Sequence, residues 1–163
     1  MPAAGANVGR YMIGMGAIIE LKGTNKILVL KRNSDFQHGQ WEIMYGRIDQ
    51  HEEFAEGLRR EVKEETGLTD LKIKKLSRIW HIYRGEKSTE NELFGCTFIC
   101  ETETEKIYLS REHTEYKWIE YEKAVGLSQV SGIDADMKLY LRRKNGEKIG
   151  IEYSNLDEST VEY

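Results

Sequence analysis

Residues 46–68, GRIDQHEEFAEGLRREVKEETGL, constrain the fold of this chain more than any other stretch. The pattern predicts a helix from about residue 52 to Thr66 that ends at Gly67, since glycine readily takes the left-handed conformation found at helix ends. Ala55, Leu58 and Val62 recur at intervals of three and four residues, so we expect them to form one buried stripe. A helix with a single apolar stripe has to pack against another element.

The same helix carries three closely spaced acidic residues, Glu61, Glu64 and Glu65. At about 100° per residue they fall within roughly 100° of arc, at the edge of the apolar stripe. Carboxylates that converge on one point suit a hard divalent cation such as Mg²⁺, which takes oxygen ligands. A solvated acidic face is the alternative, because like charges four residues apart cost only about 0.2–0.5 kcal/mol on an exposed helix. The carboxylates alone leave both interpretations open.

Strand-like segments surround this helix. The predicted strands are 11–22, 26–32, 41–45, 71–83 and 93–102, a turn at 23–25 makes the first two a hairpin, and a second helix is predicted over 134–143. This order predicts one mixed sheet with helices on its faces. The length fits one domain, which we place at residues 1–145, followed by an acidic extension, 146–163, that is either a strand or a disordered tail.

Charge and hydropathy exclude several classes of protein. The net charge of -4 disfavours a non-specific nucleic-acid binder, which would need a basic face. The longest apolar stretch, residues 11–21, is too short to span a bilayer and is interrupted by glycines. With no secretory signal pattern at the start, we expect a cytoplasmic protein that binds neither nucleic acid nor membrane.

One spaced pattern within residues 46–68 is much more specific than the charges. Nine fixed positions match the signature of the Nudix hydrolases, and the chain resembles that family, which includes the MutT-like enzymes: Gly46, Glu52, Arg60, Glu61, Val62, Glu64, Glu65, Gly67 and Leu68. The resemblance implies an α/β/α sandwich with a mixed β-sheet. It also implies a pyrophosphohydrolase that uses Mg²⁺ or Mn²⁺ to cleave a diphosphate bond in a small nucleotide, either a nucleoside diphosphate derivative or a (d)NTP.

The resemblance assigns roles within the signature. It implies metal ligands at the carbonyl of Gly46 and at Glu61, Glu64 and Glu65, of which Glu61 and Glu64 also count as catalytic residues. Arg60 would orient a glutamate through a charge-assisted fork, and Glu52 would be an auxiliary acid near the metals.

Three further residues are predicted outside the signature. Many relatives use a glutamate from a later loop, and Glu112, six residues before Trp118, is our candidate ligand or general base, with Glu115 as the fallback and an ordinary surface glutamate as the alternative. Arg32, at the end of the second strand, is a candidate for binding substrate phosphates. Tyr83 is similar in position to a tyrosine of diadenosine polyphosphate hydrolases, although strand aromatics are usually structural.

Two positions lack glycines of the family pattern, and Asp49 stands where a glutamate is common. Tyr45 and His51 stand where relatives commonly have glycine, so the loop has to accommodate side chains close to the ligand. None of the proposed ligands is lost, and we expect these departures to alter substrate geometry more than catalysis.

Two other functions compete with hydrolysis. A non-catalytic nucleotide-binding module would keep the fold, but such modules usually lose the acidic ligands that this chain retains. A prenyl diphosphate isomerase would need a reactive cysteine, whereas Cys96 and Cys100 lie roughly 13 Å apart on one predicted strand and are expected to be buried thiols. An exposed strand edge could also pair two subunits into a homodimer.

Overall fold

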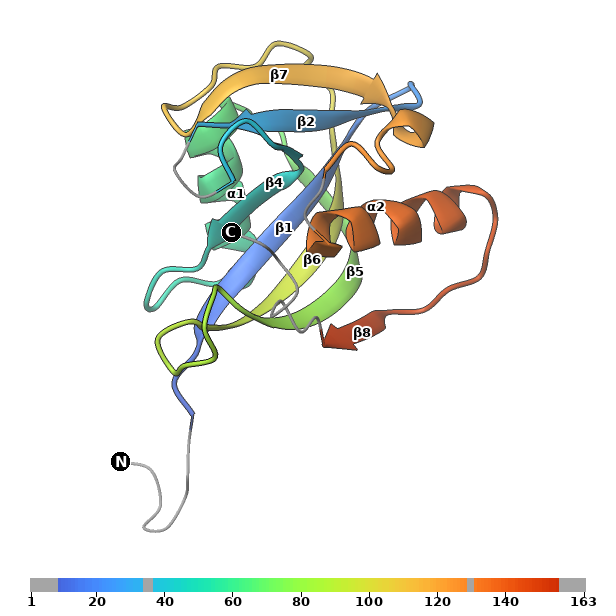
Figure 1. Ribbon diagram of the computed structural model, residues 1–163. Coiled ribbons are helices and arrows are strands. Elements are labelled where there is room, and N and C mark those ends of the chain that lie inside the picture. Colours follow the sequence, from blue (N-terminus) through green and yellow to red (C-terminus); the bar gives the residue numbers. More distant parts are fainter. Residues whose placement is uncertain (1–8, 34–36, 129–130, 156–163) are drawn as a thin grey trace.

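The computed structural model describes residues 9–33, 37–128 and 131–155. Figure 1 shows the arrangement of its elements, which follow the order β1 (Met12–Leu21), β2 (Lys26–Arg32), β3 (Trp41–Glu42), β4 (Met44–Arg47), α1 (Phe54–Thr66), β5 (Lys72–Tyr83), β6 (Glu92–Thr102), β7 (His113–Glu120), η1 (Tyr121–Lys123), α2 (Ser131–Lys144) and β8 (Glu152–Asn155). The predicted strands and both predicted helices appear in the expected order, whereas β7 and η1 were not among the predicted elements.

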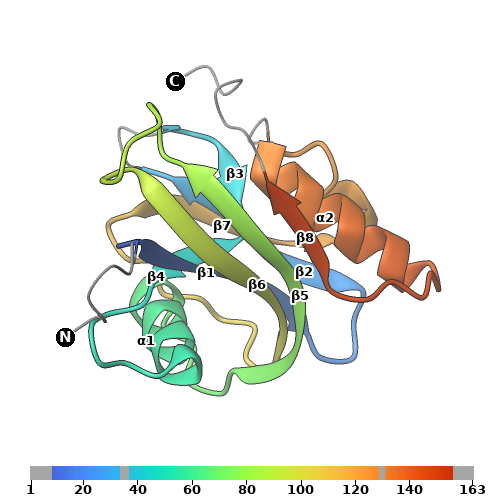
Figure 2. The same ribbon diagram turned by 90° about the horizontal axis from the view of Figure 1, so that it is seen from below.

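The strands form one mixed sheet in the order β3-β2-β1-β6-β5-β8, with β4 paired to β1 and β7 paired to β2. β1 runs parallel to β6 and antiparallel to β2 and β4. Figure 2 shows α1 and α2 on opposite sides of this sheet. The predicted α/β/α sandwich is the architecture observed.

Alternate residues of β1 belong to two separate hydrophobic cores, one packed against each helix. Met15, Ala17 and Ile19 pack on the α1 side, whereas Ile18 packs with α2. Successive side chains of a strand point to opposite faces, so a strand buried on both faces reads as a continuous apolar run. This explains the run at residues 11–21 without any role in a membrane.

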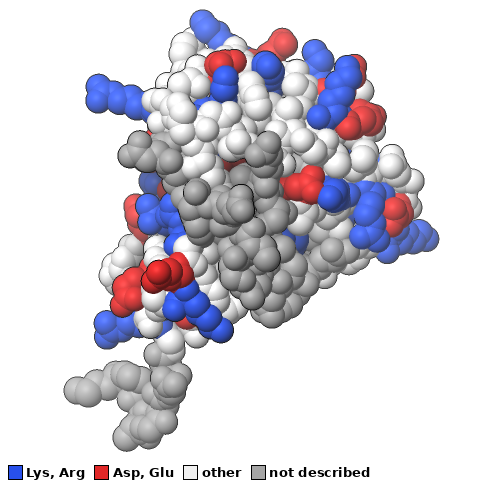
Figure 3. All heavy atoms as spheres, viewed as in Figure 1, with Lys and Arg blue, Asp and Glu red and all other residues white. Residues whose placement is uncertain are grey.

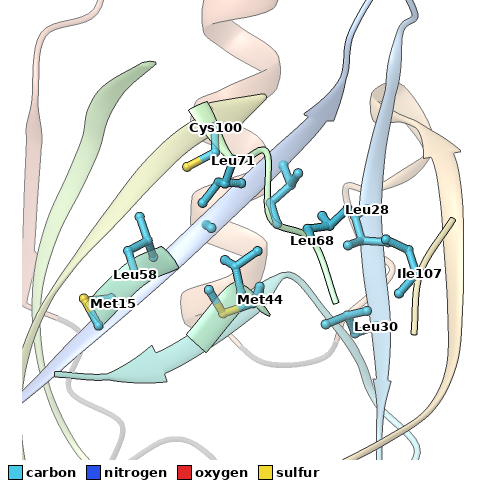
Figure 4. Packing of buried hydrophobic residues seen from close by; sticks show 12 residues of the cluster. Met15, Leu28, Leu30, Met44, Leu58, Leu68, Leu71, Cys100 and Ile107 are labelled. Carbon is cyan, nitrogen blue, oxygen red and sulfur yellow. The ribbon is translucent and has the colours of Figure 1, made fainter. Parts of the chain in front are cut away.

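Helix α1 begins after Glu53 and ends at Gly67, whose φ of 74° lies in the left-handed region and whose N–H donates to the carbonyl of Lys63. Figure 4 shows Leu58 of this helix close to Met15 of β1. The expected stripe is wrong at Ala55, which is exposed. The buried residues of the helix include Leu58, Val62 and Glu65 instead. The middle and end of the helix cover the sheet, whereas its first turn faces solvent.

The predicted strand 41–45 divides into two strands that pair with different partners. β3 pairs with β2, where Glu42 lies opposite Leu30, and β4 pairs with β1, where Tyr45 lies opposite Gly16. The chain thus changes its pairing partner between Glu42 and Met44. Glu42 of β3 and Gly46 of β4 both line the same cavity.

The C-terminal segment extends the sheet. β8 runs parallel to β5, which makes residues 152–155 a strand, whereas residues 156–163 lie outside the described residues. The placement of a domain boundary at residue 145 stays a prediction.

The surface carries both signs of charge. On the face shown in Figure 3, Lys and Arg side chains are scattered among Asp and Glu side chains and uncharged residues. Within the described ranges, neither helix is long and apolar enough to cross a membrane. The cytoplasmic location and the absence of nucleic-acid binding stay predictions.

Candidate active site

A cavity of about 290 Å³ opens between the signature loop, the end of β2, the start of β7 and the β5–β6 strands. One end is acidic and is lined by Gly46, Glu42, Glu61, Glu65 and Glu112. The sheet therefore brings three of the four predicted acidic ligands, and the predicted carbonyl ligand, to one place. Across the described part of the chain, no three acidic, His or Cys side chains already stand at the separations of a closed metal site.

Arg60 forms a two-pronged contact with Glu52. Its Nε and Nη2 atoms donate to the two carboxylate oxygens of Glu52 at 2.8 and 2.9 Å, and Nη2 also donates to the carbonyl of Arg47 at 3.0 Å. These bonds lower the pKa of Glu52 to about 2, so this carboxylate stays ionised. Arg60 thus ties the start of α1 to the loop that follows Gly46.

Glu61 lies directly against Gly46. Its Oε1 accepts the N–H of Arg47 at 3.1 Å, and a Cβ added at residue 46 would lie 2.4 Å from Glu61 Cγ. Carbon atoms cannot approach so closely, so only glycine at this position leaves Glu61 in place.

Glu65 is the most buried of the predicted ligands, with 6% of its surface exposed. Its Oε2 has no hydrogen-bond partner among the described residues. Burial, followed by the charges of Glu61 and Glu112, raises its pKa to about 9. Without a cation, the carboxyl is therefore protonated at neutral pH.

The remaining predicted acids differ in position. Glu112 is exposed and lines the cavity, on the loop that precedes β7. Its fallback, Glu115, pairs with Lys31 at 2.7 Å and is not part of the cavity wall. Glu64 has an exposed side chain whose Oε2 lies 3.4 Å from Nη1 of Arg60, and it does not line the cavity.

The two predicted substrate-binding residues have other contacts. Arg32 lines the cavity, but its Nη1 donates to both oxygens of Glu42, at 2.7 and 3.0 Å. Tyr83 donates its hydroxyl to Glu92 Oε1 and does not line the cavity, although its neighbours Ile82 and Arg84 do.

The two departures from the family pattern have structural consequences. Tyr45 donates its hydroxyl to Asp136 Oδ2 at 2.5 Å, and Asp136 forms a buried ion pair with Arg78 at 2.7 Å. This network connects β4 and β5 to α2. His51 has a φ of 69°, in the left-handed region that favours glycine.

Comparison with known proteins identifies the family. The family model described as the NUDIX domain matches residues 10–142. This chain belongs to the NUDIX family. The match confirms both the resemblance inferred from the signature and the predicted enzyme class, a hydrolase acting on pyrophosphate bonds.

Individual relatives of this NUDIX chain agree with that result. The RNA pyrophosphohydrolase of Pelagibacter ubique is 27% identical over 152 residues, which cover 83% of this chain and 89% of that protein. The MutT protein of Methanosarcina mazei Go1 has a TM-score of 0.67 at 27% identity, covering 87% of this chain and all of that one. A NUDIX hydrolase from Nitrosomonas europaea has a TM-score of 0.75 over 91% of this chain and 81% of its own, but at 18% identity this likeness concerns the fold.

The cysteines of this NUDIX chain do not fit isomerase chemistry. Both are free thiols on β6, and neither lines the cavity. Burial raises the pKa of Cys96 and brings that of Cys100 to about 12, so both stay protonated at neutral pH.

Arg47, Glu42 and His113 line the cavity and were not predicted from the sequence. Arg47 follows Gly46 directly and could have been noticed as a cation inside the signature. Glu42 and His113 are both buried and lie 3.0 Å apart through Glu42 Oε1 and His113 Nε2. Their distance in the sequence gives no signal that they meet.

Proposed function

We propose that this protein is a Mg²⁺- or Mn²⁺-dependent pyrophosphohydrolase that cleaves one diphosphate bond of a nucleoside diphosphate derivative or a (d)NTP. The observation that carries this proposal is Glu65, a buried carboxyl with one unsatisfied oxygen and with Glu61 and Glu112 close enough to raise its pKa. A divalent cation would remove both the repulsion and the unsatisfied oxygen. Carboxylates with a backbone carbonyl are also the donors that a hard cation takes.

Four oxygen donors would hold the cation: the side chains of Glu61, Glu65 and Glu112 and the carbonyl of Gly46. Bound there, a divalent cation neutralises charge on the phosphate oxygens and lowers the pKa of a water molecule. Glu64 stays in the predicted ligand set, and its exposed side chain would have to turn from Arg60 toward the cavity.

Arg60 and Glu112 have the roles of positioning the signature loop and of binding the cation or accepting a proton. Arg60 holds Glu52 and the carbonyl of Arg47, so it fixes the loop that presents the Gly46 carbonyl. Glu112, exposed at the cavity rim, is the candidate for either of two roles: a ligand of the cation, or the general base that accepts a proton from the attacking water, which has to be within reach and face an ionised group.

The apolar part of the cavity wall supports a nucleotide as the substrate. Trp80 lies across Gly14 and Gly95, since a Cβ at either glycine would come within 2.5 Å of its ring, and its Nε1 donates to Thr97. The indole therefore gives a fixed apolar wall beside Ile82, Leu93 and Ile133. Arg47, exposed on the cavity wall, would bind the phosphates that lie between this wall and the acids.

The first experiment incubates the purified protein, with and without Mg²⁺ or Mn²⁺, with a panel of possible substrates and resolves the products by chromatography. The panel contains (d)NTPs, ADP-ribose, diadenosine polyphosphates, dinucleotide cofactors, nucleotide sugars and, because the curated relative is an RNA pyrophosphohydrolase, 5′-triphosphorylated RNA. We expect metal-dependent cleavage of one diphosphate bond.

Matched variants make the test specific. Glu65→Gln should reduce turnover at least a hundredfold, whereas Glu56→Gln, on an exposed position of the same helix, should not. Glu112→Gln against Glu115→Gln compares the cavity glutamate with its exposed neighbour. Full activity of Glu65→Gln would refute the proposal, and saturable nucleotide binding without any product would support the non-catalytic module instead.

A further inference from the structure

Arg32, Glu42 and His113 form a chain of contacts behind Glu65, and the last two are buried. Arg32 holds both carboxylate oxygens of Glu42, and His113 Nε2 lies 3.0 Å from Glu42 Oε1. The side chains of Glu42 and His113 are 3% and 4% exposed. Charged groups so deeply buried are costly unless they are paired, so the three side chains hold one another in fixed orientations.

The chain of contacts ends at two unsatisfied atoms that face each other. His113 Nδ1 lies 4.0 Å from Glu65 Oε2. Both atoms are buried, and neither has a hydrogen-bond partner within the described ranges. Buried polar atoms are rarely unsatisfied, so two of them facing each other call for a shared partner.

The contact with Glu42 decides what His113 offers to Glu65. A carboxylate oxygen accepts hydrogen bonds, so in the neutral ring Nε2 carries the hydrogen and Nδ1 presents a lone pair. A separation of 4.0 Å is too long for a direct hydrogen bond. The Nδ1 lone pair therefore faces the Glu65 carboxyl as a buried acceptor, with no other partner for either atom among the described residues.

The sheet brings these residues together from three strands. Arg32 ends β2, Glu42 lies in β3 and His113 begins β7, and β2 pairs with both of the other strands. The β2–β7 register shifts between Lys31 and Arg32, next to the Arg32–His113 pair. Bulges of this kind redirect a side chain at the end of a ladder.

We propose that His113, held by Glu42 and Arg32, is a positioning residue whose Nδ1 faces Glu65, fixes the orientation of its carboxyl group and so prepares it to bind a divalent cation. This inference rests on the proposed function, because it assumes that Glu65 is a ligand. Outer contacts that orient a ligand typically change metal affinity 10–100-fold when they are removed.

Two substitutions at residue 113 separate positioning from structural support. His113→Gln keeps a polar group near the position of Nε2, facing Glu42, and loses the acceptor at Nδ1. His113→Asn places its amide oxygen near the position of Nδ1 and loses the contact with Glu42. A purely structural histidine would be replaced better by Gln, whereas a positioning histidine would be replaced better by Asn.

The measurement is Mn²⁺ binding without substrate, followed by electron paramagnetic resonance, together with thermal unfolding of each variant. We expect His113→Gln to weaken Mn²⁺ binding at least tenfold and His113→Asn to stay within about threefold of the wild type. His81→Gln is the matched control, because His81 Nε2 also pairs with a glutamate, Glu92, at 2.9 Å but does not line the cavity. Its affinity should be unchanged.

Mn²⁺ binding by Glu65→Gln, measured alongside, separates a failure of the proposed ligand set from a failure of the positioning role of His113. If Glu65→Gln leaves Mn²⁺ affinity unchanged, the proposed ligand set itself fails. If it weakens binding while His113→Gln does not, or if Asn is worse than Gln at residue 113, the positioning role alone is refuted.

Should the histidine variants not fold, Glu42→Gln carries the same test. An amide at residue 42 can donate to the ring, which would move the histidine hydrogen to Nδ1 and remove the acceptor. Weaker Mn²⁺ binding would support the inference, and unchanged binding would overturn it.

Discussion

Glu65→Gln is expected to change how the stability of the metal-free protein depends on pH. The pKa of Glu65 is raised from 4.5 to about 9, mainly by burial. The folded protein therefore keeps this proton at pH values where the unfolded chain has released it. Under the linkage relation, stability falls as pH rises from 4.5 toward 9, because the folded state binds more protons than the unfolded state in that range.

The size of the effect follows from the shift. Each pH unit within this window removes up to about 1.4 kcal/mol, so Glu65 should cost the wild type about 2–3 kcal/mol between pH 5 and pH 7. The full effect applies because the side chain is 93% buried. Glutamine does not ionise, so Glu65→Gln should lack this part of the pH dependence.

Urea unfolding in the presence of EDTA, from pH 5 to pH 8, measures the difference for the wild type, Glu65→Gln and the exposed control Glu56→Gln. The free energy of unfolding of Glu65→Gln should fall less steeply with pH than that of the other two. Mg²⁺ should stabilise the wild type more at pH 8 than at pH 5.5, because cation and proton compete for the same carboxylate. An equal dependence of the free energy of unfolding on pH for the wild type and Glu65→Gln would show that burial and the nearby carboxylates do not raise the pKa of Glu65.

Three further substitutions test other parts of the site. Gly46→Ala should lower kcat/KM at least tenfold in steady-state assays, with an unchanged circular dichroism spectrum, because its Cβ would displace Glu61; full activity would show that Glu61 need not lie there. Asp136→Asn removes the carboxylate that faces the buried Arg78 and should cost about 3–5 kcal/mol in urea unfolding, so a loss below 1 kcal/mol would contradict the buried pair. His51→Gly should raise the free energy of unfolding by about 0.5–1 kcal/mol, since relief of the left-handed strain exceeds the entropy that glycine adds to the unfolded chain; a decrease would argue against that strain.

The helix and its signature were predictable because their information is local. The period of Leu58 and Val62 and the stop at Gly67 depend on neighbouring residues, and the helix begins and ends close to the predicted positions. The fixed spacing of Gly46 and Glu61 identified the family from one continuous stretch. Arg60 pairs with Glu52, which lies only eight residues earlier in the chain, in the loop before α1.

Tertiary structure decided the environment of these residues. Period alone did not show that Ala55 would be exposed and Glu65 buried, because that depends on which turn of α1 covers the sheet. The sequence by itself determined the family, helix α1 and the order of most strands. Only the pairing of β2 with both β3 and β7 placed Glu42 and His113 behind Glu65, since contacts between strands distant in the chain arise from sheet register rather than from local sequence pattern.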